Sequence, residues 1–270
     1  MSRQARASSA VVLLAGLLAA CGSSGATSGS PASIAPIPQA SATATATSSA
    51  AASARAIATP TAAAAASQLL IEGFEGWSVF NPTSVDASAD AGTLVLKLTR
   101  RALWFQGQRG VLVWKPLDGD FRITATVGVA RTSDSSAPLD EGGAVRLAGL
   151  MAHADSVRQN YVFIVVGADA DGLSVETKST RDNASRFEGP AWPAPSADLR
   201  LCRSGATFTL LKRAAGSSDP WVVAATIERP DLLGELQVGP NLYSDSQPDV
   251  TARFTNLELE PLASGSACAD

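Results

Sequence analysis

From residue 68 onward the chain consists of short stretches in which apolar and polar residues alternate, divided by Gly, Pro, Asp and Asn. Successive side chains of a β-strand point to opposite faces, so each stretch presents one apolar and one polar face. Leu94, Leu96 and Leu98 share one face of such a stretch, and residues 121–129 alternate in the same way. No segment shows a sustained helical period. The pattern therefore predicts an all-β protein.

The expected strands, about ten to twelve in number, are enough for two antiparallel sheets packed face to face. Two of them, 145–153 and 160–166, are apolar on both faces, which is typical of central strands. The other main strands are expected at 93–99, 110–115, 121–129, 173–179, 198–203, 207–213, 221–227, 234–243 and 251–260. We expect residues 182–197 to form a long irregular loop and Trp221 to belong to the core.

Residues 22–67 are almost entirely Ala, Ser, Thr, Pro and Gly, and Arg55 carries their only charge. Such a composition has few large side chains to bury, so it is typical of a disordered linker. The predicted divisions are therefore a leader at 1–20, a linker at 21–67, a β-sandwich domain at 68–262 and a C-terminal tail at 263–270.

The leader has the three parts of an export signal. Arg3 and Arg6 precede an apolar run at 11–20, which is too short to span a bilayer as a helix. The run ends in Leu18-Ala19-Ala20-Cys21, which resembles a bacterial lipoprotein signal. The resemblance implies that Cys21 carries acyl chains such as palmitate and anchors an extracytoplasmic protein to the cell membrane or the outer membrane. An ordinary secretory signal followed by a chance cysteine is the alternative.

The two remaining cysteines, Cys202 and Cys268, are expected to form a disulfide, because exported proteins fold in an oxidising compartment. His153 is the only histidine, so no zinc cluster of the usual kind is expected. Asp169-x-Asp171-Gly172 resembles the start of a calcium loop, but Thr180 stands where such a loop needs Glu. We predict no metal or other cofactor, while calcium remains an alternative.

The charge balance argues against one class of partner. The chain has 21 Lys and Arg against 25 Asp and Glu, which gives a net charge of −4. Proteins that bind nucleic acid usually carry a basic patch or stripe, and none is visible here. We therefore expect no nucleic-acid partner.

Several short motifs follow one another between residues 74 and 259. They are Gly119-Asp120-Phe121, Ala148-Gly149-Leu150-Met151, Asn160-Tyr161-Val162, Asp198-Leu199-Arg200-Leu201, Gly205-x-x-Phe208, Trp221 after a Ser-Asp turn, and Ala252-Arg253-Phe254-x-Asn256. Their order and spacing resemble a concanavalin A-like jelly-roll domain, in particular its laminin-G-like branch. The resemblance implies a two-sheet antiparallel sandwich that binds carbohydrate or another surface.

Aromatic residues are the best functional candidates within this resemblance. Sugars stack their apolar faces on flat rings while amides and charged groups bond their hydroxyls, and tryptophan and tyrosine combine an apolar body with a polar end. The candidate ligand-binding residues are Trp104, Trp114, Arg146, His153, Asn160, Tyr161 and Trp192. The alternative is that each tryptophan fills the core or seals an edge.

Catalytic patterns are not visible. Jelly-roll glucanases carry Glu-x-Asp-x-x-Glu or a near variant on one strand, where the acids share a face, and this spacing does not occur here. No Gly-x-Ser-x-Gly motif surrounds a serine. We therefore expect no enzyme but a membrane-anchored binding module that recognises glycans on the concave sheet. A protein–protein or assembly module of the cell envelope is the alternative, and a remnant glycoside hydrolase ranks third.

Overall fold

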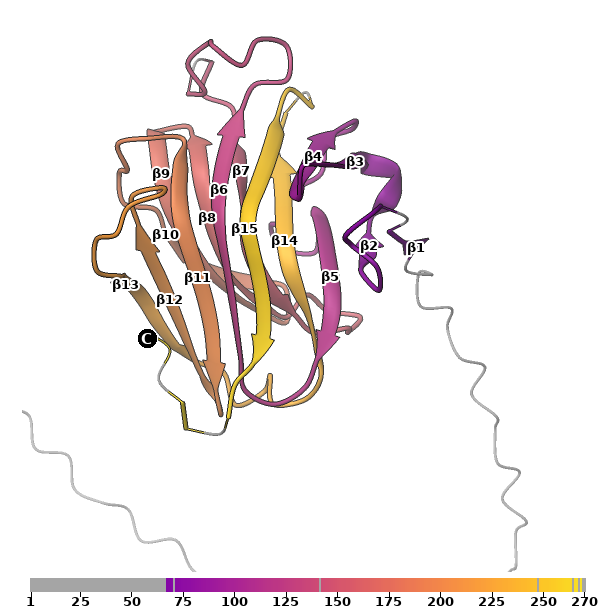
Figure 1. Ribbon diagram of the computed structural model, residues 1–270, viewed down its shortest axis with the longest axis vertical. Coiled ribbons are helices and arrows are strands. Elements are labelled where there is room, and N and C mark those ends of the chain that lie inside the picture. Colours follow the sequence, from indigo (N-terminus) through magenta and orange to yellow (C-terminus); the bar gives the residue numbers. More distant parts are fainter. Residues whose placement is uncertain are drawn as a thin grey trace, which may run out of the picture. The chain divides into compact units, whose positions relative to one another are not determined.

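The computed structural model describes residues 67–69, 71–140, 142–246, 248–263, 265–266 and 268. These residues form fifteen β-strands and a single 3-10 turn, η1 (Pro82–Ser84). The strands build two antiparallel sheets that lie face to face (Figure 1). The predicted fold class, an all-β two-sheet sandwich, is therefore confirmed. The predicted leader, Cys21 and the predicted linker as far as residue 66 lie outside the described residues.

The larger sheet has eight strands, whose spatial order is β1-β2-β5-β14-β7-β8-β9-β10. Their bounds are β1 (Ser67–Gln68), β2 (Ser78–Phe80), β5 (Val111–Leu117), β14 (Leu236–Ser244), β7 (Arg146–His153), β8 (Tyr161–Asp169), β9 (Gly172–Arg181) and β10 (Ala184–Glu188). The strands β7 and β8, which were expected to be central, lie in the middle of this sheet, and β10 forms one of its edges.

The smaller sheet has seven strands in the order β13-β12-β11-β6-β15-β4-β3, and it forms the front layer of Figure 1. Their bounds are β13 (Val222–Glu228), β12 (Thr207–Arg213), β11 (Ser196–Ser204), β6 (Phe121–Ala130), β15 (Thr251–Pro261), β4 (Thr93–Leu98) and β3 (Val85–Asp90). Six of the seven strands match predicted stretches within a few residues, and β3 was not expected.

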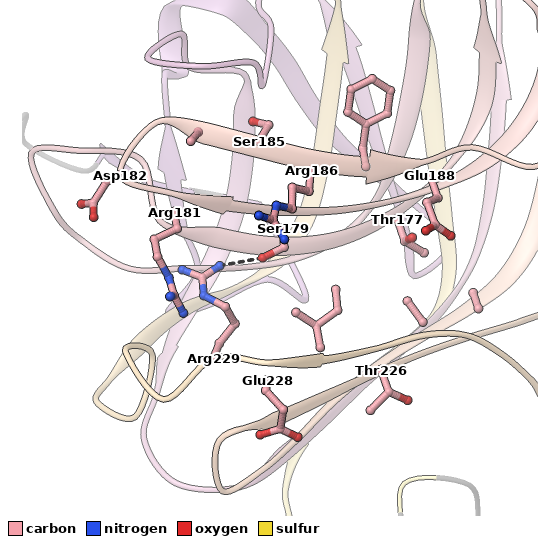
Figure 2. Close-up of a pocket in the computed structure, with 15 residues that line it drawn as sticks. Thr177, Ser179, Arg181, Asp182, Ser185, Arg186, Glu188, Thr226, Glu228 and Arg229 are labelled. Atoms are coloured by element: carbon pink, nitrogen blue, oxygen red, sulfur yellow. Dashed lines mark hydrogen bonds between the residues drawn. The ribbon is translucent and has the colours of Figure 1, made fainter. Parts of the chain in front are cut away.

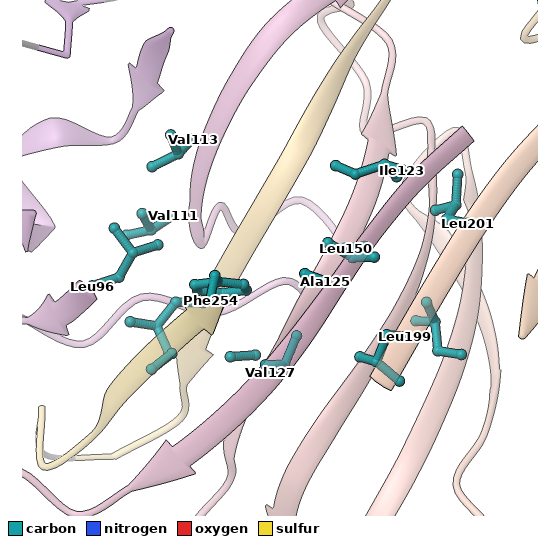
Figure 3. Close-up of a cluster of buried hydrophobic side chains, with 14 of the residues drawn as sticks. Leu96, Val111, Val113, Ile123, Ala125, Val127, Leu150, Leu199, Leu201 and Phe254 are labelled. Carbon is teal, nitrogen blue, oxygen red and sulfur yellow. The ribbon is translucent and has the colours of Figure 1, made fainter. Parts of the chain in front are cut away.

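The core lies between the sheets, where the apolar side chains of both inner faces meet (Figure 3). Along β6 every second residue is buried, from Phe121 to Val129, as its alternation predicts. Leu199 and Leu201 of β11 enter the same core beside it. Burying side chains of this size stabilises the fold by roughly 1.5–3 kcal/mol each, so the alternation seen in the sequence decides which face of each strand points inward.

Two expectations are wrong. Residues 182–197 do not form one irregular loop, because Ala184–Glu188 pairs with β9 as the edge strand β10. Asp182 and Asn183 both have positive φ angles, 50° and 70°, which is the geometry of a tight hairpin turn. Trp221 does not lie in the core. Its ring is half-buried between the guanidinium groups of Arg200 and Arg213, which are 4.3 and 4.5 Å from its centroid.

The disulfide between Cys202 and Cys268 is confirmed. It connects β11 with the C-terminal residues across a sequence separation of 66 residues. Cys202 lies on the outer face of its strand, opposite the leucines that enter the core, as the alternation of residues 199–203 predicts. The bond therefore fastens the end of the chain to the outside of the smaller sheet.

We expect the double variant Cys202→Ala, Cys268→Ala to unfold more easily than the wild type. A cross-link over a loop of this length lowers the entropy of the unfolded chain and contributes about 4 kcal/mol in the chain-entropy model. Urea unfolding of the variant and of the oxidised and reduced wild type measures the difference. Equal midpoints for the oxidised and reduced wild type would contradict this prediction.

Candidate ligand-binding groove

Three of the predicted ligand-binding residues meet on the outer face of the eight-stranded sheet. The ring of Trp104 lies 5.6 Å from that of His153 and 5.5 Å from that of Tyr161, measured between centroids. Phe80 completes the group, with its ring stacked 5.8 Å from Trp104. Sequence reasoning therefore selected side chains that do converge. However, Trp104 and Tyr161 have no exposed surface and His153 has 1%, so they form no open platform.

The segment 99–110, which joins β4 to β5, covers this outer face. Ala102 forms an isolated bridge with Ser244 at the end of β14. The Trp104 carbonyl accepts a hydrogen bond of 3.3 Å from Lys178 of β9, and a Cβ at Gly110 would overlap with the Trp104 ring. Trp104 therefore packs beneath its own segment, and the part of this face where the predicted residues converge is closed.

Buried polar groups beneath the segment bond to one another. The two ring nitrogens of His153 lie 2.9 Å from Oε1 of Gln237 and 3.3 Å from Oε1 of Gln159. Burial lowers the pKa of His153, which favours the neutral imidazole. Burial also raises the pKa of Tyr161 to about 12. The surroundings of His153 and Tyr161 are therefore those of buried residues that hold the packing of this face together.

A second polar group on this face was not predicted. Nζ of Lys178 lies 2.8 Å from Oε1 of Glu176, and both side chains are more than 90% buried. The Tyr243 hydroxyl donates a hydrogen bond of 3.2 Å to the same carboxylate oxygen. Charges buried in this way are stable only when paired, so the ion pair belongs to the packing of this face.

The other predicted residues lie apart from one another. Trp114 is half-buried at the edge of the aromatic group, and Arg146 is buried and donates to the Leu139 carbonyl at 2.8 Å. The Asn160 amide oxygen accepts from the Asp182 backbone at 3.0 Å. Trp192 packs against the main core. These four positions do not form a common site.

The structure has an open groove elsewhere, between the free edges of the two sheets (Figure 2). Its volume is about 820 Å³. One wall comes from β9 and β10, and the other comes from β13. Each of β10 and β13 has a neighbouring strand on one side only, so the groove is bordered by two strand edges whose outward backbone groups have no strand partner.

The walls of this groove are rich in polar groups. Hydroxyls come from residues such as Thr177 and Ser179, and charged ends come from Arg186, Glu188 and Glu228. Apolar surface comes from Ala224, Ala225 and Ile227, which pack against the core between the sheets. The ring of Phe187 points to the other side of β10, where Nζ of Lys178 lies 4.9 Å from its centroid. The groove therefore offers hydrogen-bond donors, acceptors and apolar surface at one accessible place.

Arg229 closes one end of the groove. Its side chain is only 2% exposed and donates to the backbone carbonyls of Tyr161 and Thr180 at 3.1 and 2.9 Å. It also pairs with Asp231 at 2.8 Å. The bonds to Arg229 hold the pKa of Asp231 at about 2. One guanidinium thus joins the end of β13 to β8 and β9 and fixes the distance between the two walls.

Within the described part of the chain, no cluster of three or more His, Cys, Asp or Glu side chains is placed to hold a metal ion. In the same part, no helix has the length and apolar character needed to cross a membrane.

Comparisons with known proteins give the fold. No protein-family model matches the chain, and neither does any curated protein. Among solved structures, a functionally unknown protein from Saccharomyces cerevisiae is similar in fold, with a TM-score of 0.56 and 14% sequence identity. The match covers 70% of the present chain and 97% of the yeast protein's chain. A xylan beta-1,4-xylosidase from Bacillus halodurans matches 68% of this chain with 13% identity and a TM-score of 0.53. A legume lectin-like domain from Entamoeba histolytica matches 70% of this chain and 91% of its own, with 7% identity and a TM-score of 0.47.

The expectation that this protein is no enzyme is corrected by the second of these matches. A xylosidase is an enzyme, so a sandwich of this kind occurs in a protein that cleaves glycosides. The missing Glu-x-Asp-x-x-Glu spacing concerns one group of jelly-roll enzymes and therefore does not exclude catalysis. The present chain spans about a third of the xylosidase (36%), and the likeness at this identity shows a shared fold alone.

The ion pair at the closed end predicts a specific pH dependence. Asp231 has a pKa of about 2 in the folded protein, below the value of about 3.9 for an unfolded Asp. Its contribution to stability is therefore complete above about pH 4 and is lost as the pH falls towards 2. Because the Asp231 side chain is 35% exposed, we expect this contribution to be only about 1 kcal/mol.

Urea unfolding of Asp231→Asn and the wild type at pH 6 and pH 2.5 tests this dependence. The stability difference between the two proteins should be present at pH 6 and smaller at pH 2.5. Asp171→Asn, an exposed change in the turn before β9, serves as the control. The same difference at both pH values would show that the carboxylate charge is not responsible.

Proposed function

We propose that the domain binds carbohydrate in the groove between β10 and β13. The observation that carries this proposal is the combination, in one open groove of about 820 Å³, of charged and hydroxyl side chains with the apolar surface of Ala224, Ala225 and Ile227. The location differs from the one expected from the sequence, because Trp104, His153 and Tyr161 are buried where the segment 99–110 packs.

The chemistry of the groove suits a sugar. A sugar presents many hydroxyls, each of which both donates and accepts hydrogen bonds, and the guanidinium of Arg186 and the carboxylate of Glu188 supply the complementary groups. In the described structure neither of these two side chains has an ion-pair or hydrogen-bond partner of its own. The side chains of Ala224, Ala225 and Ile227 on the opposite wall offer an apolar surface against which the C–H face of a sugar can pack. The shared fold with a xylan beta-1,4-xylosidase makes xylan oligosaccharides the first ligands to test.

We expect Arg186→Ala and Glu188→Gln to weaken binding to oligosaccharides on a glycan array, each by roughly tenfold, because a hydrogen bond to a charged group contributes about 1.5 kcal/mol. Gln106→Ala, an exposed change on the segment 99–110, is the matched control and should bind as the wild type does. Release of reducing sugar from the same ligands tests for hydrolysis.

Saturable binding that both groove variants leave unchanged would contradict this location of the site. No binding to any oligosaccharide would contradict carbohydrate recognition itself.

We also propose that the protein is exported and held to a membrane by acyl chains on Cys21. This proposal is supported by Leu18-Ala19-Ala20-Cys21 after a basic and then an apolar segment. A lipoprotein cysteine carries at least two acyl chains, which is enough for stable attachment. Residues 22–66, with a single charge, then separate the sandwich domain from the anchor.

We expect the wild-type protein, produced in a bacterium with its leader, to fractionate with membranes and to begin at an acylated Cys21. Mass spectrometry of the purified protein should show the added mass of the lipid. Cys21→Ser removes the acyl acceptor and should leave the protein without lipid. A wild-type chain that starts at Met1 without modification would refute the anchor.

A further inference from the structure

The outer edge of β10 is free in the described structure, because β9 is the only strand that pairs with it. β10 follows a two-residue turn at Asp182 and Asn183, whose φ angles are 50° and 70°. The residues that flank such a turn exchange both of their backbone hydrogen bonds, and bonded and non-bonded positions alternate from there. The N–H and C=O groups of Ser185 and Phe187 therefore point away from β9 and towards the free edge.

The side of the sandwich that carries this edge also exposes apolar side chains. Five large apolar side chains are exposed in the part of the chain that the structure describes. Three of them lie on the edge strands β10 and β13, namely Phe187 at 55%, Val222 at 57% and Val223 at 55%. Figure 1 shows these two strands at the same side of the molecule. Free backbone groups beside exposed apolar side chains are the features with which an edge strand pairs with another strand.

Charged side chains usually protect an edge strand from pairing, but those of β10 match a second copy of the same strand. Arg186 and Glu188 share one face of β10, and Phe187 lies between them on the other face. An antiparallel pair centred on Phe187 places Arg186 of each copy directly opposite Glu188 of the other copy. These two positions do not exchange backbone hydrogen bonds, so their side chains come close, with Cβ atoms about 4.5–5.5 Å apart. Opposite charges at such positions attract, and they do so twice in the pair.

We propose that two copies of this chain associate through β10, antiparallel and about a two-fold axis at Phe187. The backbone groups of Phe187 then bond to those of its copy, and the two rings lie side by side on the outer face of the sheet. The partner contacts the same residues that it offers, which is the property of a two-fold symmetric interface. The two eight-stranded sheets become one continuous sheet.

The pairing also changes the surroundings of the groove. The inner faces of both copies lie on the same side of the joined sheet, so the two grooves open towards each other. Each Arg186 is then beside Glu188 of the partner copy. A guanidinium has five donors and a carboxylate about four acceptor positions, so a paired Arg186 and Glu188 still offer hydrogen bonds to a ligand. The dimer therefore goes beyond the proposed function and does not depend on it.

Sedimentation velocity over a wide range of protein concentration, without any sugar, measures the association. The full chain carries Cys21→Ser in every sample, so that no acyl chain can cause it. We expect a monomer at low concentration and a dimer at high concentration. The contact joins two strands of 5 residues each, which bury less area than a standard stable interface, so the dimer should be weak.

Charge reversal tests the register of the pair. Arg186→Glu and Glu188→Arg each place like charges opposite one another and should raise the dissociation constant of the dimer by roughly tenfold or more. The double variant Arg186→Glu, Glu188→Arg exchanges the charges and should associate as the wild type does. An equal mixture of the two single variants should also associate, because each supplies the charges that the other needs. Arg100→Glu, an exposed change beyond the end of β4, is the matched control.

Phe187→Pro tests the backbone contact. The Phe187 N–H points to the free edge, so proline at this position removes a bond between the copies and none to β9. The ring that meets its copy is lost as well, and we expect the variant to remain monomeric. Phe187, Arg186 and Glu188 are exposed, so thermal unfolding should show that all these variants keep the fold.

A wild type that stays monomeric at every concentration would overturn the dimer. A dimer that Phe187→Pro or either single charge reversal leaves unchanged would show that β10 is not its interface. These results are separate from those on sugar binding. A monomer that binds oligosaccharides would leave the groove proposal intact, and a dimer that binds none would leave the β10 pairing intact.

Discussion

The middle strands of the eight-stranded sheet are buried on both of their faces, and this constraint limits where a ligand has room to bind. Strand β7 is buried along its whole length, and β8 is buried except for its last residue. One face packs on the smaller sheet, and the segment 99–110 with Trp104 closes part of the other. The free space is therefore at the side of the sandwich, where the edge strands β10 and β13 face each other across the groove.

Much of this fold could be predicted from local pattern. The alternation of 121–129 and of Leu94, Leu96 and Leu98 gave the correct buried faces, because every second side chain of a strand must share a face. The apolar stretches 145–153 and 160–166 were correctly expected to be central. The disulfide followed from counting cysteines, and it needed only that Cys202 lie on the face away from the core.

The groove could not be predicted in the same way, since its parts are joined by long-range contacts. Arg229 binds carbonyls that lie 49 and 68 residues earlier in the chain, and nothing near it in the sequence indicates these partners. β10 was missed because an exposed edge strand needs little apolar character, so Ala184–Glu188 lacks the usual pattern. The burial of Trp104 depends on the path of the segment 99–110, which composition does not reveal.

The account depends on the lateral groove, and not the covered face, being the place where sugar binds. Amide chemical-shift mapping of the isotope-labelled protein during titration with a xylan-derived oligosaccharide measures this most directly. The account predicts that the amides of 177–188 and 224–229 shift while those of β7 and the segment 99–110 stay in place. Shifts centred on Trp104, His153 and Tyr161, with the groove amides unchanged, would contradict it.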